Sequence, residues 1–80
     1  MRLPRSLGGA DLVKALARIA YAPTRQTGSH IRLSYPGPPE HHVTVPNHDP
    51  IRVGTLAAIL SDIADQRKIT KDQLISLIFG

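Results

Sequence analysis

Apolar and polar residues follow two different periods along this chain, and the change of period divides it into helical and extended segments. Where apolar residues recur every three to four positions, the sequence predicts amphipathic helices. Where apolar and polar residues alternate, it predicts half-buried strands. Helical spacing covers residues from about 10 to 20, from about 53 to 66 and from 71 to about 79, and alternation covers 24–27, 30–35 and 41–46.

The connections between the three predicted strands are short, which favours an antiparallel meander. Gly28-Ser29 is a tight-turn sequence, and the proline-rich stretch 36–39 has to be a loop because proline cannot donate to a sheet. With the helices added, the predicted order of elements is α-β-β-β-α-α. The predicted fold class is therefore α+β, with a three-stranded antiparallel sheet and the helices on one of its faces.

The two faces of the predicted sheet differ in character, because successive side chains of a strand point to opposite sides. One face is apolar and has to be covered by the helices. The other face is polar and partly basic, and it stays open to water or to a partner. The apolar face carries Ile31, Leu33, Val43 and Val45, and the polar face carries His30, Arg32, Ser34, His42 and Thr44.

Several residues mark where the elements begin and end. Asp11 suits the first turn of the first helix, since the helix dipole favours a carboxylate there. Thr70 and Gln73 form a capping-box pattern at the start of the last helix. Pro23 lacks a backbone donor, so the first strand is expected to lie at an edge or to start late. The apolar residues of the last helix are expected to complete a lean core, and packing on a partner is the alternative.

Length and composition restrict the class of protein. Eighty residues, of which 41% are hydrophobic, fit a single domain spanning 1–80. The absence of cysteine excludes disulfide scaffolds, cysteine zinc sites and thiol nucleophiles. The longest apolar run, 53–60, is far shorter than the roughly 20 residues that span a bilayer, and the start of the chain lacks the apolar stretch of a signal peptide. We therefore expect a soluble cytoplasmic protein with no membrane partner.

The chain is basic, with a net charge of +4 and an isoelectric point of about 10.1. On so small a body this charge produces a positive field that favours anionic partners. The lysines and arginines are dispersed along the chain, without the block that marks a polybasic tail. Ordinary solubility charge and an anion-binding surface are therefore both open interpretations of the composition.

Histidines are the remaining candidates for chemistry, and there are four of them. His41 and His42 are neighbours on a strand, so their side chains point to opposite faces and no metal site is expected. His30 directly follows the predicted turn and lies on the polar face, where a histidine can transfer protons near neutral pH. Arg25 and Arg32 lie on the strands beside it and are suited to bind a phosphate.

A surface histidine in a hairpin turn is the simpler interpretation of His30. The functional interpretation is RNA cleavage, in which a base removes the 2′-hydroxyl proton, the 2′-oxygen attacks the adjacent phosphate and an acid protonates the leaving 5′-oxygen. Nearby cations stabilise the charge that develops, so one histidine with arginines can supply this chemistry without a metal. His42 and His48 are candidates for a second acid or base by residue type, although the sequence places neither of them beside His30.

Five parts of the chain, taken in order, form one pattern, namely Asp11 to Leu16, Tyr21, Arg25 to His30, Val43 to His48 and Gly54 to Leu60. As an ordered set they resemble the HicA toxins of bacterial toxin–antitoxin systems. The similarity covers roughly residues 7–66, which would be the core of the domain, and leaves the helix of about 70–79 outside it. The resemblance implies a double-stranded-RNA-binding-domain-like α-β-β-β-α fold. It also implies an endoribonuclease that cuts mRNA and halts growth.

The resemblance further assigns roles to residues. The catalytic histidine of the family corresponds to His30, and Gly28 and Ser29 would form the turn that presents it. No cofactor, metal or small-molecule ligand is implied, and the expected partners are single-stranded mRNA and a HicB-type antitoxin that blocks the site. The residues expected to bind RNA are Arg25, Arg32 and Lys14.

One residue departs from the family pattern. The residue before Tyr21 is often glycine in these proteins, and here it is Ala20. A glycine would end the first helix in the left-handed region, where alanine costs about 1 kcal/mol. We therefore expect the first helix to end differently in this chain.

A non-catalytic RNA-binding module on the same fold is the alternative function. Such a module recognises phosphates and 2′-hydroxyls of a duplex by shape. It would need several lysines near the start of the second helix, and Arg52 is the one cation there. The sequence therefore favours a ribonuclease toxin over a module that only binds RNA.

Overall fold

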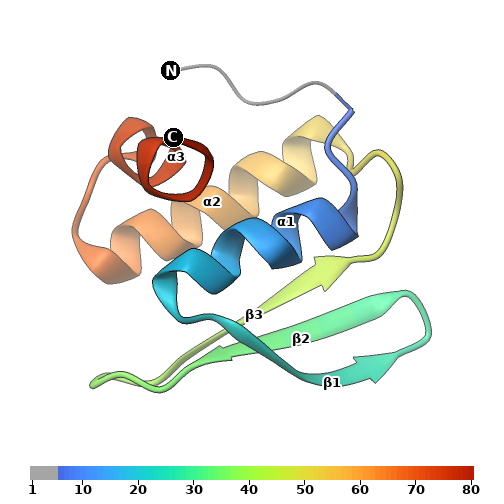
Figure 1. The fold of residues 1–80 in the computed structure, drawn as a ribbon, viewed down its shortest axis with the longest axis horizontal. Helices are drawn as coiled ribbons and strands as arrows, with labels where there is room; N and C mark the ends of the chain where they lie inside the picture. Colours follow the sequence, from blue (N-terminus) through green and yellow to red (C-terminus); the bar gives the residue numbers. More distant parts are fainter. Residues whose placement is uncertain (1–5) are drawn as a thin grey trace.

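The computed structural model describes residues 6–80 and has the predicted order of elements (Figure 1). The expectation about a signal peptide concerns residues 1–5 and lies outside the described part. The second strand, the third strand and the last helix have the predicted bounds. The elements are α1 (Gly9–Leu16), a 3₁₀ turn η1 (Ala17–Ile19), β1 (Ala22–Thr27), β2 (His30–Tyr35), β3 (His41–Pro46), α2 (Val53–Arg67) and α3 (Lys71–Phe79).

The three strands form the predicted antiparallel sheet in the order β1-β2-β3. β1 is one of the two edge strands, and all six of its residues are exposed. It begins at Ala22, two residues earlier than predicted, and the register shifts between Pro23 and Arg25. Pro23 can occupy this strand because an edge position leaves one side of the backbone without ladder hydrogen bonds. The structure therefore corrects the predicted start of this strand and confirms that the strand lies at an edge of the sheet.

The helices lie on one side of the sheet and leave its other side open (Figure 1). Leu33, Val43 and Val45 are buried beneath the helices, and Ile31 packs against this core. The alternation of the strands therefore decides which face is covered, as predicted. The largest fully buried side chains are Tyr21, Leu12, Leu16, Leu33, Leu60, Ile63, Leu74, Ile78 and Val45.

The first helix ends earlier than predicted. α1 stops at Leu16, and η1 carries the chain to Ile19. Ala20 then adopts the left-handed conformation with φ of 73°, and the N–H of Tyr21 donates to the carbonyl of Leu16 at 3.2 Å. Alanine therefore occupies the position that glycine would suit, and the full burial of the Tyr21 side chain helps to offset the backbone cost.

The loop after β3 is fastened to the start of α1. The N–H of Gly9 donates to the carbonyl of His48 at 2.9 Å, and the N–H of Ile51 donates to the carbonyl of Leu7 at 2.8 Å. A side chain at position 9 would lie 2.8 Å from Cα of Asn47, so only glycine allows this approach. The position of His48 is therefore set by contacts distant in sequence.

The last helix completes the core. Leu74, Ile75 and Ile78 are buried, and Thr70 and Gln73 form the predicted capping box, with bonds of 3.0 and 2.8 Å. The expectation that α3 contributes to folding is thus confirmed. No helix within residues 6–80 combines the length and apolar character needed to cross a membrane.

Candidate functional site

His30 stands at the start of β2, directly after the two-residue turn that joins β1 to β2. Gly28 has a φ of 58°, and a Cβ there would meet no atom within 4 Å, so the turn needs glycine for its backbone conformation and not for space. His30 is exposed and pairs with Thr27 on one side and with Pro46 on the other. The turn therefore presents the imidazole at the end of the open face, as predicted.

Arg25 and Arg32 lie directly opposite each other on β1 and β2. Together with Thr27, His30 and Thr44 they line a pocket of about 200 Å³. Like charges in directly opposed cross-strand positions destabilise a sheet. A bound anion between the two guanidinium groups would remove this repulsion, so the pair has the character of a phosphate site.

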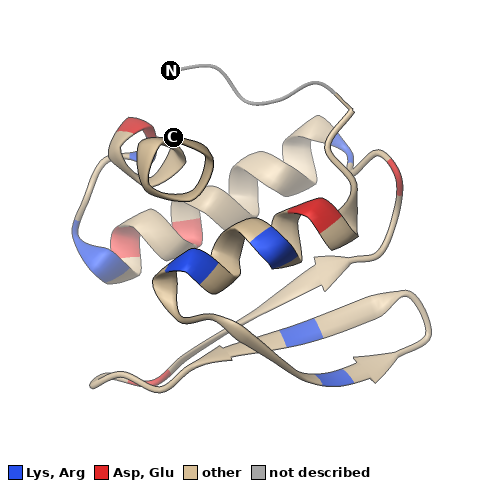
Figure 2. Ribbon diagram, in the orientation of Figure 1, with Lys and Arg blue, Asp and Glu red and all other residues tan. Residues whose placement is uncertain are grey.

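The polar groups of this pocket are free to bind a ligand. Within residues 6–80, the side chains of His30, Arg25 and Arg32 make no hydrogen bond or ion pair. Figure 2 shows basic positions and no acidic ones on β1 and β2. Within the described residues, the charges of Arg25 and Arg32 are therefore not neutralised by an ion pair.

A second pocket, of about 340 Å³, lies on the other side of His30. It is lined by His30, Thr44, Pro46, His48, Arg52 and Thr55. The backbone explains why His48 comes here, because the N–H of Asn47 donates to the carbonyl of Ser29 in the turn. The chain leaving β3 thus passes beside the turn that presents His30, and His48 follows one residue later.

His42 lies at the opposite end of the same face, and both of its ring nitrogens lie close to other side chains. Its Nδ1 lies 2.7 Å from the hydroxyl of Ser34, and its Nε2 lies 3.6 Å from a carboxylate oxygen of Glu40. His42 pairs with Ser34, four residues along β2 from His30. At the rise of a strand this separates the two histidines by roughly 13 Å. The structure brings His48, and not His42, into one pocket with His30.

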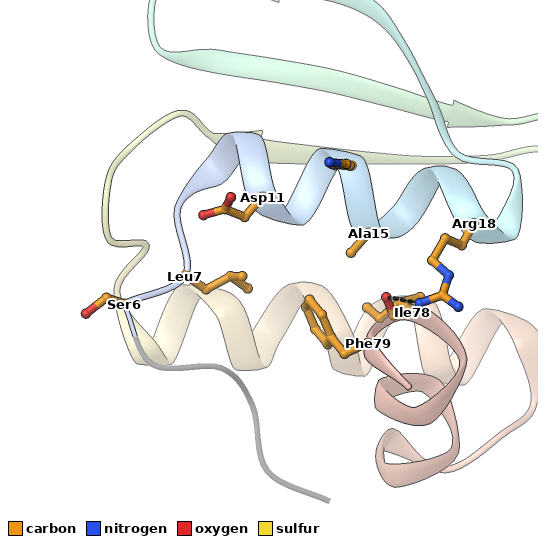
Figure 3. Close-up of a pocket in the computed structure, with 8 residues that line it drawn as sticks. Ser6, Leu7, Asp11, Ala15, Arg18, Ile78 and Phe79 are labelled. Carbon is orange, nitrogen blue, oxygen red and sulfur yellow. Dashed lines mark hydrogen bonds between the residues drawn. The ribbon is translucent and has the colours of Figure 1, made fainter.

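Lys14 lies apart from the open face. It lines a groove of about 510 Å³ between α1 and α3, in the helical layer that covers the other side of the sheet. Figure 3 shows this groove, with Arg18 donating to the carbonyl of Ile78 at 3.1 Å. Of the three predicted RNA ligands, the structure therefore groups Arg25 and Arg32 with His30 and leaves Lys14 elsewhere.

His41 points to the covered side, opposite to His42 as predicted. Its Nδ1 lies 2.6 Å from the hydroxyl of Tyr21, and its Nε2 lies 3.3 Å from a carboxylate oxygen of Asp62. Burial raises the pKa of the Tyr21 phenol above its usual value, although the nearby positive charge of Arg67 opposes the shift. This hydrogen-bonded chain ties α2 to β3 and to the segment before β1, and no spacing in the sequence indicates it.

Sequence reasoning did not connect Arg52 and Thr55 with His30. Arg52 precedes α2, and its side chain makes no capping bond. The one signal in the sequence was a cation directly before a predicted helix, which does not by itself identify a neighbour. Their place beside His30 results from the path of the loop between β3 and α2.

The titratable side chains do not gather into a metal site. Across the described part of the chain, no group of three or more histidines, aspartates or glutamates is arranged to hold a metal ion. The open face instead combines guanidinium, imidazole and hydroxyl groups, which are donors for a phosphate.

This fold and this site define a small α+β protein with a basic, histidine-bearing sheet face. The model of the family described as HicA toxin of bacterial toxin-antitoxin matches residues 9–64. The match spans more than half of the 80 residues, and the chain therefore belongs to the HicA toxin family. Comparison with curated proteins and with solved structures gave no match. Membership confirms the resemblance seen in the sequence and implies an antitoxin as partner.

Proposed function

We propose that this protein is an endoribonuclease toxin that cleaves mRNA at His30. The observation that carries the proposal is the pocket in which His30 stands beside two opposed arginines, all with free side chains. An imidazole supplies proton transfer, and guanidinium groups supply charge stabilisation at a phosphate. Membership in a family of toxins supports a destructive activity over a purely binding role.

The proposed reaction uses the RNA as its own nucleophile. A base removes the proton of a 2′-hydroxyl, the 2′-oxygen forms a bond to the adjacent phosphorus, and the bond from phosphorus to the 5′-oxygen breaks. The leaving oxygen takes a proton from an acid, and the products are a 2′,3′-cyclic phosphate and a free 5′-hydroxyl. His30 carries one of the two proton transfers, and Arg25 and Arg32 bind the phosphate oxygens.

Single-stranded RNA is the proposed substrate. The turn presents His30 on an exposed face, and an unpaired strand can adjust its backbone to bring a 2′-hydroxyl in line with the phosphate. Gly28 and Ser29 act by placing the histidine. Nothing in this chemistry calls on a cofactor or a metal.

A HicB-type antitoxin is the proposed inhibitor. Covering the open face would block His30, and an acidic surface would complement Arg25 and Arg32. The toxin would then act in the cytoplasm, where mRNA is available, after the antitoxin is lost.

The test is cleavage of single-stranded RNA by the purified protein and by His30→Ala, with the products identified by mass spectrometry. The wild type should give ends with a 2′,3′-cyclic phosphate, and His30→Ala should be slower by about 10²- to 10⁴-fold. An RNA with a single 2′-deoxy sugar at the cleaved position should resist the wild type.

Two results would contradict the proposal. Cleavage by His30→Ala at the wild-type rate would remove His30 from the chemistry. Binding of RNA without any cleavage by the wild type would favour the alternative, a module that only binds RNA. Expression of both forms with and without a HicB antitoxin would test toxicity and its inhibition separately.

A further inference from the structure

We propose that His48 carries the proton transfer that His30 does not, so that the two histidines act as the acid–base pair of the reaction. This inference rests on the proposed ribonuclease activity and deepens it by naming the second group. The observation behind it is the 340 Å³ pocket that His30 and His48 line together with Arg52.

The backbone fixes His48 relative to His30 from two sides. The N–H of Asn47 donates to the carbonyl of Ser29 in the His30 turn, and the carbonyl of His48 accepts from Gly9 at the start of α1. These bonds use main-chain atoms only, so they hold His48 in place, and its imidazole makes no hydrogen bond or ion pair within residues 6–80. Two proton-transfer groups on opposite sides of a phosphate need this kind of fixed separation.

The arrangement of cations agrees with a reacting phosphate bound at His30, where the two pockets adjoin. Arg25 and Arg32 line the pocket on one side of His30, and Arg52 lines the pocket on the other side. Thr44 lines both pockets, so they adjoin along β3. A phosphate bound at this junction would have Arg25 and Arg32 on one side and His48 and Arg52 on the other.

His42 is the competing candidate and is less suited to the role. Its two ring nitrogens are close to Ser34 and Glu40, and it lies roughly 13 Å from His30 along the strand. A base and an acid that act on one phosphate must both lie within hydrogen-bond reach of the reacting oxygens. His42 therefore serves as a matched control, because it is a histidine on the same face.

The chemical step requires one proton to leave the 2′-oxygen and one to reach the 5′-oxygen. A single histidine can perform both only if it exchanges its position between them. With two histidines, the base ends protonated and the acid ends deprotonated, and exchange with water restores both. Removing either histidine should therefore slow cleavage of ordinary RNA.

The experiment compares His48→Ala, His30→Ala and His42→Ala on two substrates that differ at one atom. The first is the RNA that the wild type cleaves, and the second has sulfur in place of the 5′-bridging oxygen at the cleaved bond. A thiolate leaves without a proton, so the second substrate needs a base but no acid. Circular dichroism shows whether each variant is folded, and the Gly9 bond to the His48 carbonyl does not depend on the side chain.

On ordinary RNA, the cleavage rate of His48→Ala should be lower than that of the wild type by about 10²- to 10⁴-fold. The rate of His42→Ala should stay within about tenfold of the wild type. On the sulfur substrate, the variant that lacks the acid should regain a cleavage rate near that of the wild type. The variant that lacks the base should stay slow. That opposite response identifies which histidine is the acid.

The inference is overturned if His48→Ala cleaves ordinary RNA like the wild type. It is also overturned if His30→Ala and His48→Ala respond alike to the sulfur atom, since His48 would then bind substrate or support the fold without sharing the proton transfers. Failure of the wild type to cleave either substrate would instead reject the proposed ribonuclease function, and the inference with it.

Discussion

Ala20 adopts a backbone conformation that alanine rarely takes, and Arg25 faces a second arginine across the sheet. Both features go against local preference. In the first case the fully buried Tyr21 side chain, which follows at once, keeps the backbone in place. In the second case the gain is a pair of cations beside His30. The unusual conformation of Ala20 therefore belongs to the fold, and the opposed arginines belong to the candidate site.

Replacing Ala20 with glycine should stabilise the protein by about 1 kcal/mol, because glycine adopts the left-handed region without the Cβ penalty. Urea denaturation followed by circular dichroism measures this change. Ala17→Gly is the matched control, since Ala17 has a right-handed φ of −61°. It should destabilise by about 0.5–1 kcal/mol. A loss of stability in Ala20→Gly would contradict the argument.

The elements contribute unequally to the fold and to the site. β1 and β2 carry the arginine pair and the turn, whereas α1 and α2 cover the opposite side of the sheet and α3 packs on the helices. α3 lies beyond the family match, which ends at residue 64, yet it supplies three buried residues. In this chain the core therefore extends past the region that the family defines.

Leu74→Ala should lower the free energy of unfolding by about 2–5 kcal/mol, because Leu74 is fully buried and its truncation leaves a cavity. Leu77→Ala in the same helix should change it by less than about 0.5 kcal/mol, since the side chain is 48% exposed. Chemical denaturation of both variants measures the difference. Equal stability of the two, with antitoxin binding lost in Leu74→Ala, would instead make α3 an interface.

Over the whole molecule, the charge is distributed unevenly. Asp62 and Glu40 lie 3.3 and 3.6 Å from ring nitrogens of His41 and His42, and the arginines of the open face make no ion pair within the described chain. Figure 2 shows the basic positions of β1 and β2 on the part of the sheet that projects away from the helices. One face of the sheet therefore carries the two unpaired arginines, and the other faces the core.

RNA binding should weaken steeply with salt, because each arginine that contacts a phosphate releases condensed counterions. In a His30→Ala background, which keeps the RNA intact, Arg25→Gln and Arg32→Gln should each reduce the slope of log affinity against log salt by about 0.7. Lys71→Gln changes the charge equally but lies at the start of α3, so it should leave the slope unchanged. Equal effects from all three variants would mean that only net charge matters.

The sequence by itself determined the order of the elements and the two faces of the sheet. Periodicity is a local property, and the residues that alternate in β2 and β3 must divide between core and surface wherever the helices lie. The turn at Gly28 and the position of His30 follow for the same reason, since two adjacent residues define the turn.

The tertiary structure alone decided which groups from outside β1 and β2 join His30. His48 and Arg52 lie beside His30 because the loop after β3 is hydrogen-bonded to Ser29 and to Gly9. The spacing of apolar residues along the sequence does not predict these contacts. Tertiary packing also decided the hydrogen-bonded series Tyr21, His41 and Asp62. It likewise placed Lys14 in the groove between α1 and α3, away from the open face. Side chains far apart in sequence meet only through packing, so His30 and its two arginines were predictable, and the place of His48 and Arg52 beside them was not.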